Sequence, residues 1–194
     1  MALSKIDDAI NLVFDLPNGL KLYHTPISES VFEANFKILA ETKAQLFGRG
    51  MAYAASSGIR VARLTLCDEG RKLAEANGQE GDSGATSLLT EIARLTNVLV
   101  PAETGWEPVP VATAISQGHL DADDWKDEEN VIVFFTCAYA LASRRAKKLT
   151  AEAIAEISAF SVTSLNCADY MRFLQTPADT EKPEKIKKTS SVPV

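Results

Sequence analysis

Near the start of the chain, hydrophobic residues alternate with polar ones, a pattern typical of β-strands with one buried face. Two such runs flank Asn18 and Gly19, a dipeptide that suits the tight turn of a hairpin. We therefore predict a short β-hairpin over about residues 11–25. The large apolar side chains on its face are Leu12, Phe14, Leu20 and Leu22. This face either closes the core or pairs with a second copy along an exposed strand edge.

Beyond the hairpin, apolar residues recur at steps of three and four, which predicts helices. The first helix is expected over residues 29–47, where Ser30 and Glu33 have the spacing of a capping box. Residues 52–78 fit a helix and a strand about equally, and we interpret them as helical. A further helix is expected from residue 83 to Pro101, because leucine and isoleucine recur along it with helical spacing.

The second half of the chain begins with residues 101–110, whose prolines predict an extended crossing over the surface. Residues 119–148 should then form the longest and most buried helix, with acids at its start and basic residues at its end, as the helix dipole favours. Thr150 and Asn166 are predicted caps of two shorter helices. Polar, lysine-rich residues after position 175 predict a disordered tail.

These patterns together predict a mainly α fold, a compact helical domain with a short N-terminal β-hairpin and a flexible C-terminal tail. The predicted parts are an N-terminal segment with the hairpin (1–28), the helical domain (29–175) and the tail (176–194). A length of 194 residues suits a single compact domain.

Composition and charge narrow the classes of partner. A net charge of −6 argues against a nucleic-acid partner, because phosphate binding requires a clustered basic surface. The longest apolar run, residues 131–142, is shorter than the roughly 20 residues that span a bilayer, so no membrane partner is expected. The three cysteines are far apart in sequence, which is typical of reduced thiols in a cytoplasmic protein.

The candidate chemistry is sparse, and we predict no catalytic, metal-binding or cofactor-binding residue. Neither His24 nor His119 has a nucleophile and an orienting acid beside it, so a small hydrolase is the least favoured alternative. The acidic run over residues 121–129 fails the calcium-loop pattern and instead fits the start of a helix. No glycine cluster has the spacing of a phosphate-binding loop.

Two tryptophans lie near the proline-rich crossing: Trp106 is within it, and Trp125 follows it near the start of the long predicted helix. Such residues either pin a long loop to the body of a protein or anchor a partner. The candidate partner-binding residues are therefore Leu12, Phe14, Leu20, Leu22, Trp106 and Trp125.

Three stretches of the chain resemble the tail assembly chaperones of long-tailed, siphovirus-type bacteriophages. They are "VFDLPNGLKLYHTPISESVFEANFKILAETKA", "VIVFFTCAYALASR" and "SVTSLNCADYMRFLQT". The similarity covers roughly residues 10–176 and contains no catalytic signature. The hairpin departs from the shorter helical members of the family, so the resemblance does not explain its role.

The resemblance implies a protein of the host cell cytoplasm that binds the tape measure protein and keeps it soluble while tail tube subunits polymerise around it. Some members of the family are also made in an extended frameshift form whose extra domain recruits the tail tube protein. Self-association is expected as well, since several copies coat one client. The main alternative is a structural virion component, such as a connector or a tail-completion protein.

Overall fold

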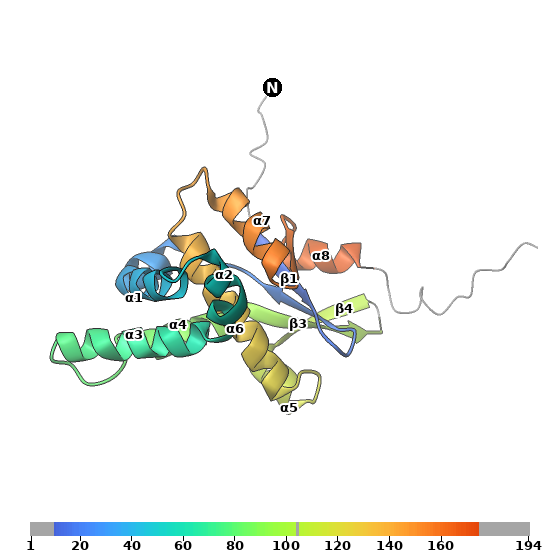
Figure 1. The fold of residues 1–194 in the computed structure, drawn as a ribbon. Coiled ribbons are helices and arrows are strands. Elements are labelled where there is room, and N and C mark those ends of the chain that lie inside the picture. Colours follow the sequence, from blue (N-terminus) through green and yellow to red (C-terminus); the bar gives the residue numbers. More distant parts are fainter. Residues whose placement is uncertain (1–9, 104, 175–194) are drawn as a thin grey trace, which may run out of the picture.

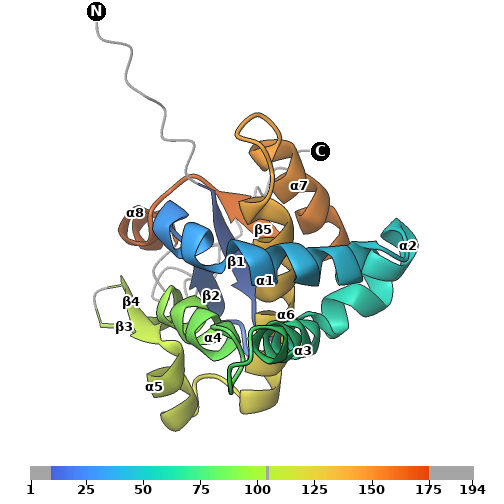
Figure 2. The same ribbon diagram turned by 90° about the vertical axis from the view of Figure 1, so that its left-hand side faces the viewer.

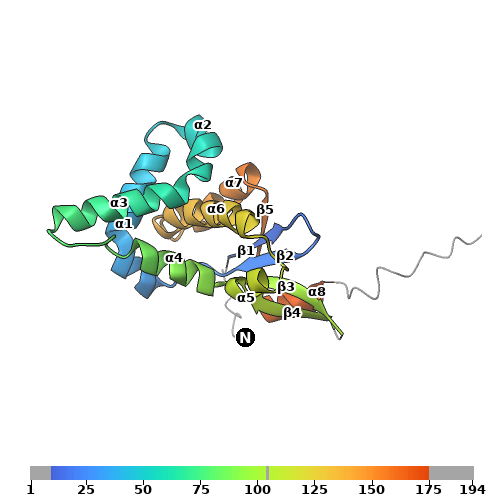
Figure 3. The ribbon, with the colours of Figure 1, turned by 90° about the horizontal axis from the view of Figure 1, so that it is seen from below.

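Figure 1 shows the fold in the computed structural model, which describes residues 10–103 and 105–174. Five antiparallel strands form one sheet in the order β4-β3-β2-β1-β5. Most helices cover one face of this sheet, and α8 (Cys167–Phe173) lies on the opposite face (Figure 3). The fold is therefore mixed α/β, and the prediction of a mainly α fold was wrong.

The predicted N-terminal hairpin is confirmed as β1 (Asn11–Asp15) and β2 (Lys21–His24). Gly19 supplies the positive φ of its turn, at 81°, and the Asn18 side chain donates a hydrogen bond to the His119 carbonyl at 2.8 Å. However, the hairpin lies at the centre of the sheet, because β1 also pairs with β5 and β2 also pairs with β3. Both strands of the hairpin are thus paired on both sides, and a second copy cannot pair along the hairpin as one of the two expectations had it.

A second hairpin corrects the prediction of a helix reaching Pro101. Helix α4 (Ala85–Arg94) ends early, and β3 (Thr96–Ala102) and β4 (Gly105–Pro110) follow. In β3, Val98 packs among the helices while its neighbour Leu99 packs on the α8 side. Because both faces of this strand are buried, it lacks the alternation that identifies half-exposed strands. The proline-rich segment is extended, as predicted, but it is paired with β3.

The helical layer is built around α6 (Ala122–Ala140), whose residues from 132 to 138 are all buried. It packs on α1 (Glu29–Phe47) and α3 (Ala62–Ala76). The predicted bounds of α1 are confirmed, but its cap is Ser28, whose hydroxyl accepts a hydrogen bond from the Val31 N–H at 3.4 Å.

Short elements complete the layer. The region after α1, predicted to be helical, is confirmed as α2 (Met51–Tyr53), the π-helical turn η1 (Ala54–Gly58) and α3. Helix α5 (Val111–Ser116) links β4 to the start of α6. Gly70 in α3 permits a close approach of the chain, because a Cβ there would clash with the Asp82 carbonyl oxygen.

The C-terminal part differs from the predicted helix ends. Helix α6 stops at Ala140, so the basic cluster expected at its end lies in the next turn and the start of α7 (Lys147–Ile157). Thr150 is consequently inside α7 and does not cap it. The sequence patterns missed β5 (Phe160–Thr163). Asn166 caps α8 as predicted, accepting from the Asp169 N–H at 2.9 Å, and the predicted tail lies outside the described residues.

Candidate functional site

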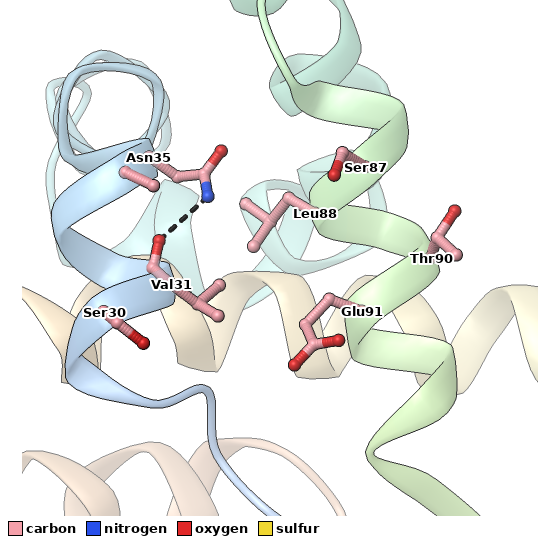
Figure 4. A pocket seen from close by; sticks show the side chains of 8 residues that line it. Ser30, Val31, Asn35, Ser87, Leu88, Thr90 and Glu91 are labelled. Carbon is pink, nitrogen blue, oxygen red and sulfur yellow. Dashed lines mark hydrogen bonds between the residues drawn. The ribbon is translucent and has the colours of Figure 1, made fainter.

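A surface cleft lies between the first half of α1 and the facing side of α4 (Figure 4). Its volume is about 550 Å³, which is within the range of ligand-sized clefts. We call it the α1–α4 cleft. Its lining residues are Ser30, Val31, Ala34, Asn35, Ser87, Leu88, Thr90 and Glu91.

The α1–α4 cleft has an apolar floor because each helix places aliphatic side chains on its inner side. In Figure 4, Val31 on α1 and Leu88 on α4 point toward one another across the gap. Leu88 is 1% exposed and belongs to the main core, so the floor of the cleft is continuous with the interior. Ala34, one turn along α1, is small and leaves room above this floor.

Polar groups form the rim. The Asn35 side chain donates from Nδ2 to the Val31 carbonyl at 2.8 Å, which fixes the amide and leaves Oδ1 as its acceptor. Glu91 accepts two hydrogen bonds from Arg94, both of 2.7 Å. These bonds lower the pKa of Glu91, so the rim carries an ionised carboxylate that is paired with Arg94.

A smaller cleft of about 290 Å³ lies on the other side of α1 and shares Ala34 and Asn35 with the first. It is bordered by Phe36 and by Leu73 of α3. Phe36 is 49% exposed, although its ring is large and apolar. The exposed side of α1 therefore offers apolar surface on both sides of Ala34.

This arrangement suits non-covalent binding of a segment that carries both apolar and polar groups. The lining contains hydroxyls, one amide and one ion-paired carboxylate, and it contains neither histidine nor cysteine. Among the described residues, no group of three or more His, Cys, Asp or Glu side chains could hold a metal ion. All three cysteines are free thiols, and burial raises the pKa of Cys137 to about 12.

None of the six predicted partner-binding residues lines the cleft. Leu12, Phe14 and Leu22 come together inside the main core, each no more than 1% exposed. Leu20 and Trp125 are partly buried against the same core, whereas Trp106 packs near α8 on the other face of the sheet. A partner-binding role for these residues stays a prediction.

The cleft residues were missed because no local pattern marks them. The apolar stripe of α1 identifies its buried side, but Ala34 and Ser87 look like ordinary surface positions. They become part of a cleft only because α1 and α4 lie side by side, far apart in sequence. The sequence indicated one of the lining residues, Leu88, as buried, because it belongs to an apolar pattern with helical spacing.

His24, considered as a catalytic group, lies wholly inside the molecule. Its Nδ1 is 2.8 Å from the Thr96 hydroxyl, and that hydroxyl donates its own hydrogen to the Ile92 carbonyl at 2.7 Å. The Nδ1 must therefore carry the imidazole hydrogen, and Nε2 is buried with no hydrogen-bond partner among the residues that the structure describes. Burial lowers the pKa of His24 to about 3, so the ring is a neutral, structural element of the core.

Comparison of the chain with protein-family models, with curated proteins and with solved structures finds no match. Within the described ranges, none of the helices has both the length and the apolar character needed to cross a membrane.

Proposed function

We propose that this protein is a non-enzymatic tail assembly chaperone of a long-tailed bacteriophage. In this proposal it binds the tape measure protein in the host cell cytoplasm and keeps it soluble while the tail tube is assembled. An extended frameshift product would recruit the tail tube protein. The supporting observation is the α1–α4 cleft, a groove between two helices whose lining combines aliphatic residues on its floor with polar groups around them.

Two parallel ridges of side chains are the usual receptor for an amphipathic helix, which lays its apolar face into the groove between them. Here Val31 and Ala34 would contact the apolar face of the client above the buried Leu88, and Phe36 would extend that contact beyond Ala34. Asn35 Oδ1 can accept hydrogen bonds from polar side chains at the edge of the client. The net charge of −6 helps a complex with several copies remain soluble.

Co-expression with the tape measure protein tests this proposal. Ala34→Arg would place a long charged side chain in the middle of the cleft, at a position that is exposed and so tolerates the change in the folded chain. We expect the wild-type protein to retain the tape measure protein in the soluble fraction. The variant should lose this effect, with at least a tenfold weaker affinity in a pull-down, about 1.4 kcal/mol.

Ala44→Arg is the matched control, because it makes the same exchange at another exposed position of α1 that does not line either cleft. Equal solubilisation by both variants would contradict the proposed cleft. Failure of the wild-type protein itself to hold the client would contradict the chaperone function. Stoichiometric amounts of the protein in purified particles would instead support a virion connector or tail-completion protein.

A further inference from the structure

In the part of the chain that the structure describes, strand β5 leaves one edge of the sheet open. Among the described residues it pairs with β1 alone, over Phe160 to Thr163, and it ends the strand order. Figure 2 shows β5 at this end of the sheet beside α7. An open edge presents unpaired N–H and C=O groups to any strand that can align with it.

The opposite edge is chemically different. β4, at the other end of the sheet, contains Pro108 and Pro110, which have no backbone N–H to donate. Prolines on an edge strand oppose the addition of another strand. β5 has no proline, and three of its four residues, Phe160, Val162 and Thr163, are of types that favour strands. The fold thus blocks one edge of its sheet and leaves the other able to pair.

Helix α7, which precedes β5 directly, carries an apolar stripe on its exposed side. Its inner side packs on α6 and β5 through Ala151 and Ile154, which are buried. Leu149 and Ile157, on the other side, are 69% and 39% exposed. Ala153 lies midway between them, so the three residues follow one another at helical spacing along a single face.

We propose that two copies of this chain associate about a two-fold axis through β5 and α7. The two β5 strands would pair antiparallel, joining the sheets of both copies into one. The same axis places the two α7 helices side by side and antiparallel on one face of that sheet. Such an interface is self-complementary, as a two-fold axis requires.

The residues of α7 match this antiparallel arrangement in size and charge. Ala153 would lie at the axis, where its small side chain permits close approach of the two helices. Leu149 would contact the partner's Ile157, and Lys148 would face the partner's Glu156. Glu152, close to the axis, already has a counter-ion, because its carboxylate lies 3.9 Å from the Lys148 ammonium of the same helix. Four residues of β5 would not hold a dimer alone, so both elements are needed.

Sedimentation equilibrium of the full chain tests the inference without any client, so its failure is separate from failure of the proposed chaperone function. The wild-type protein should have twice its chain mass of 21.0 kDa at micromolar concentration. Ala153→Arg puts two guanidinium groups at the axis and should raise the dissociation constant at least about tenfold. Ala44→Arg, the same exchange on α1, should leave the dimer intact.

Charge reversal provides the sharper test of the antiparallel register. Lys148→Glu alone and Glu156→Lys alone should each weaken the dimer, because each places like charges opposite one another. The double variant Lys148→Glu/Glu156→Lys restores opposite charges across the axis and should recover most of the lost affinity. A monomeric wild-type protein, a dimer that survives Ala153→Arg, or a double variant no tighter than the single ones would each overturn the inference.

Discussion

At the scale of single residues, Glu128 is a carboxyl group that works against folding at neutral pH. It is half-buried on α6, with Asp127 beside it and Asp124 one turn earlier. Burial, followed by the charges of these two aspartates, raises the pKa of Glu128 from 4.5 to about 7. The helix dipole does not offset this cost, because Glu128 lies beyond the first turn of α6, where acids are favoured.

Glu128→Gln should therefore stabilise the protein in a pH-dependent way. Below pH 4.5 the carboxyl is protonated in both the folded and unfolded states, so the variant should match the wild type. As pH rises to 7 the unfolded chain ionises first, and above pH 7 the folded protein holds an unfavourable charge. At pH 8 we expect the free energy of unfolding to increase by roughly 1–3 kcal/mol. Urea denaturation at pH 4 and pH 8 measures the difference.

Glu75→Gln is a suitable control, because it removes the same charge from an exposed position on α3. It should change stability by no more than about 0.5 kcal/mol at either pH. A gain for Glu128→Gln that is equal at both pH values would show that ionisation of the buried carboxyl is not its cause.

At the scale of elements, α8 is held on its face of the sheet by a small set of contacts. The Tyr23 hydroxyl donates to the Leu165 carbonyl at 2.7 Å, and the Asn11 amide donates to the same oxygen at 3.1 Å. The Tyr23 and Tyr170 rings lie 5.9 Å apart, and the satellite cluster around them contains few buried side chains. Helices with so few anchors open locally at a lower free energy than the core.

Tyr23→Phe should loosen α8 while leaving the rest of the fold intact. Loss of one buried hydrogen bond costs about 1 kcal/mol, which corresponds to roughly fivefold faster amide hydrogen exchange in α8. Exchange in α6 should not change. Tyr170→Phe keeps both the Tyr23 hydroxyl and the ring contact, so it should leave exchange in α8 near the wild-type rate. Similar acceleration by both variants would show that the Leu165 contact is not the anchor.

The same elements show how far local patterns determine this fold. The hairpin of β1 and β2 was predictable because Asn18 and Gly19 mark a turn between alternating residues. The strand β3 was not, since burial of Val98 and Leu99 on opposite faces removes the alternation. β5 is only four residues long and follows a strong helical pattern directly. The C-terminal end of α6 was not predictable either, because residues 131–149 contain no glycine or proline to mark it.

The candidate site was less predictable than the elements that form it. The bounds of α1 were predicted correctly, and Leu88 was predicted to be on the buried side of its helix. The cleft nevertheless depends on the separation of α1 and α4, which no residue in either helix specifies alone. The antiparallel match proposed for α7 likewise becomes visible only when β5 is known to end the sheet.

At the scale of the whole molecule, His24 links the sheet to the helical layer. Through Thr96, its imidazole is connected to the last turn of α4, so the chain of hydrogen bonds joins β2, β3 and α4. The ring is wholly buried, and protonation would place at Nε2 an N–H that no described residue accepts. Charging this residue therefore requires the core to open, which makes its titration a property of global unfolding.

Acid should consequently unfold the protein in part through His24. The folded-state pKa is about 3 and the ordinary value is 6.5, so the unfolded chain binds the proton first and stability falls as pH drops between these values. From pH 7.5 to pH 4.5 this residue alone should remove about 2–3 kcal/mol from the free energy of unfolding.

His24→Asn keeps a donor near Thr96 but cannot titrate. Its free energy of unfolding should therefore fall by that much less over this pH range, even if it starts lower at pH 7.5. The control His119→Asn leaves the buried His24 ring in place, so it should lose as much stability in acid as the wild type. Parallel curves for the wild type and His24→Asn, measured by urea denaturation across this range, would show that the acid transition arises elsewhere.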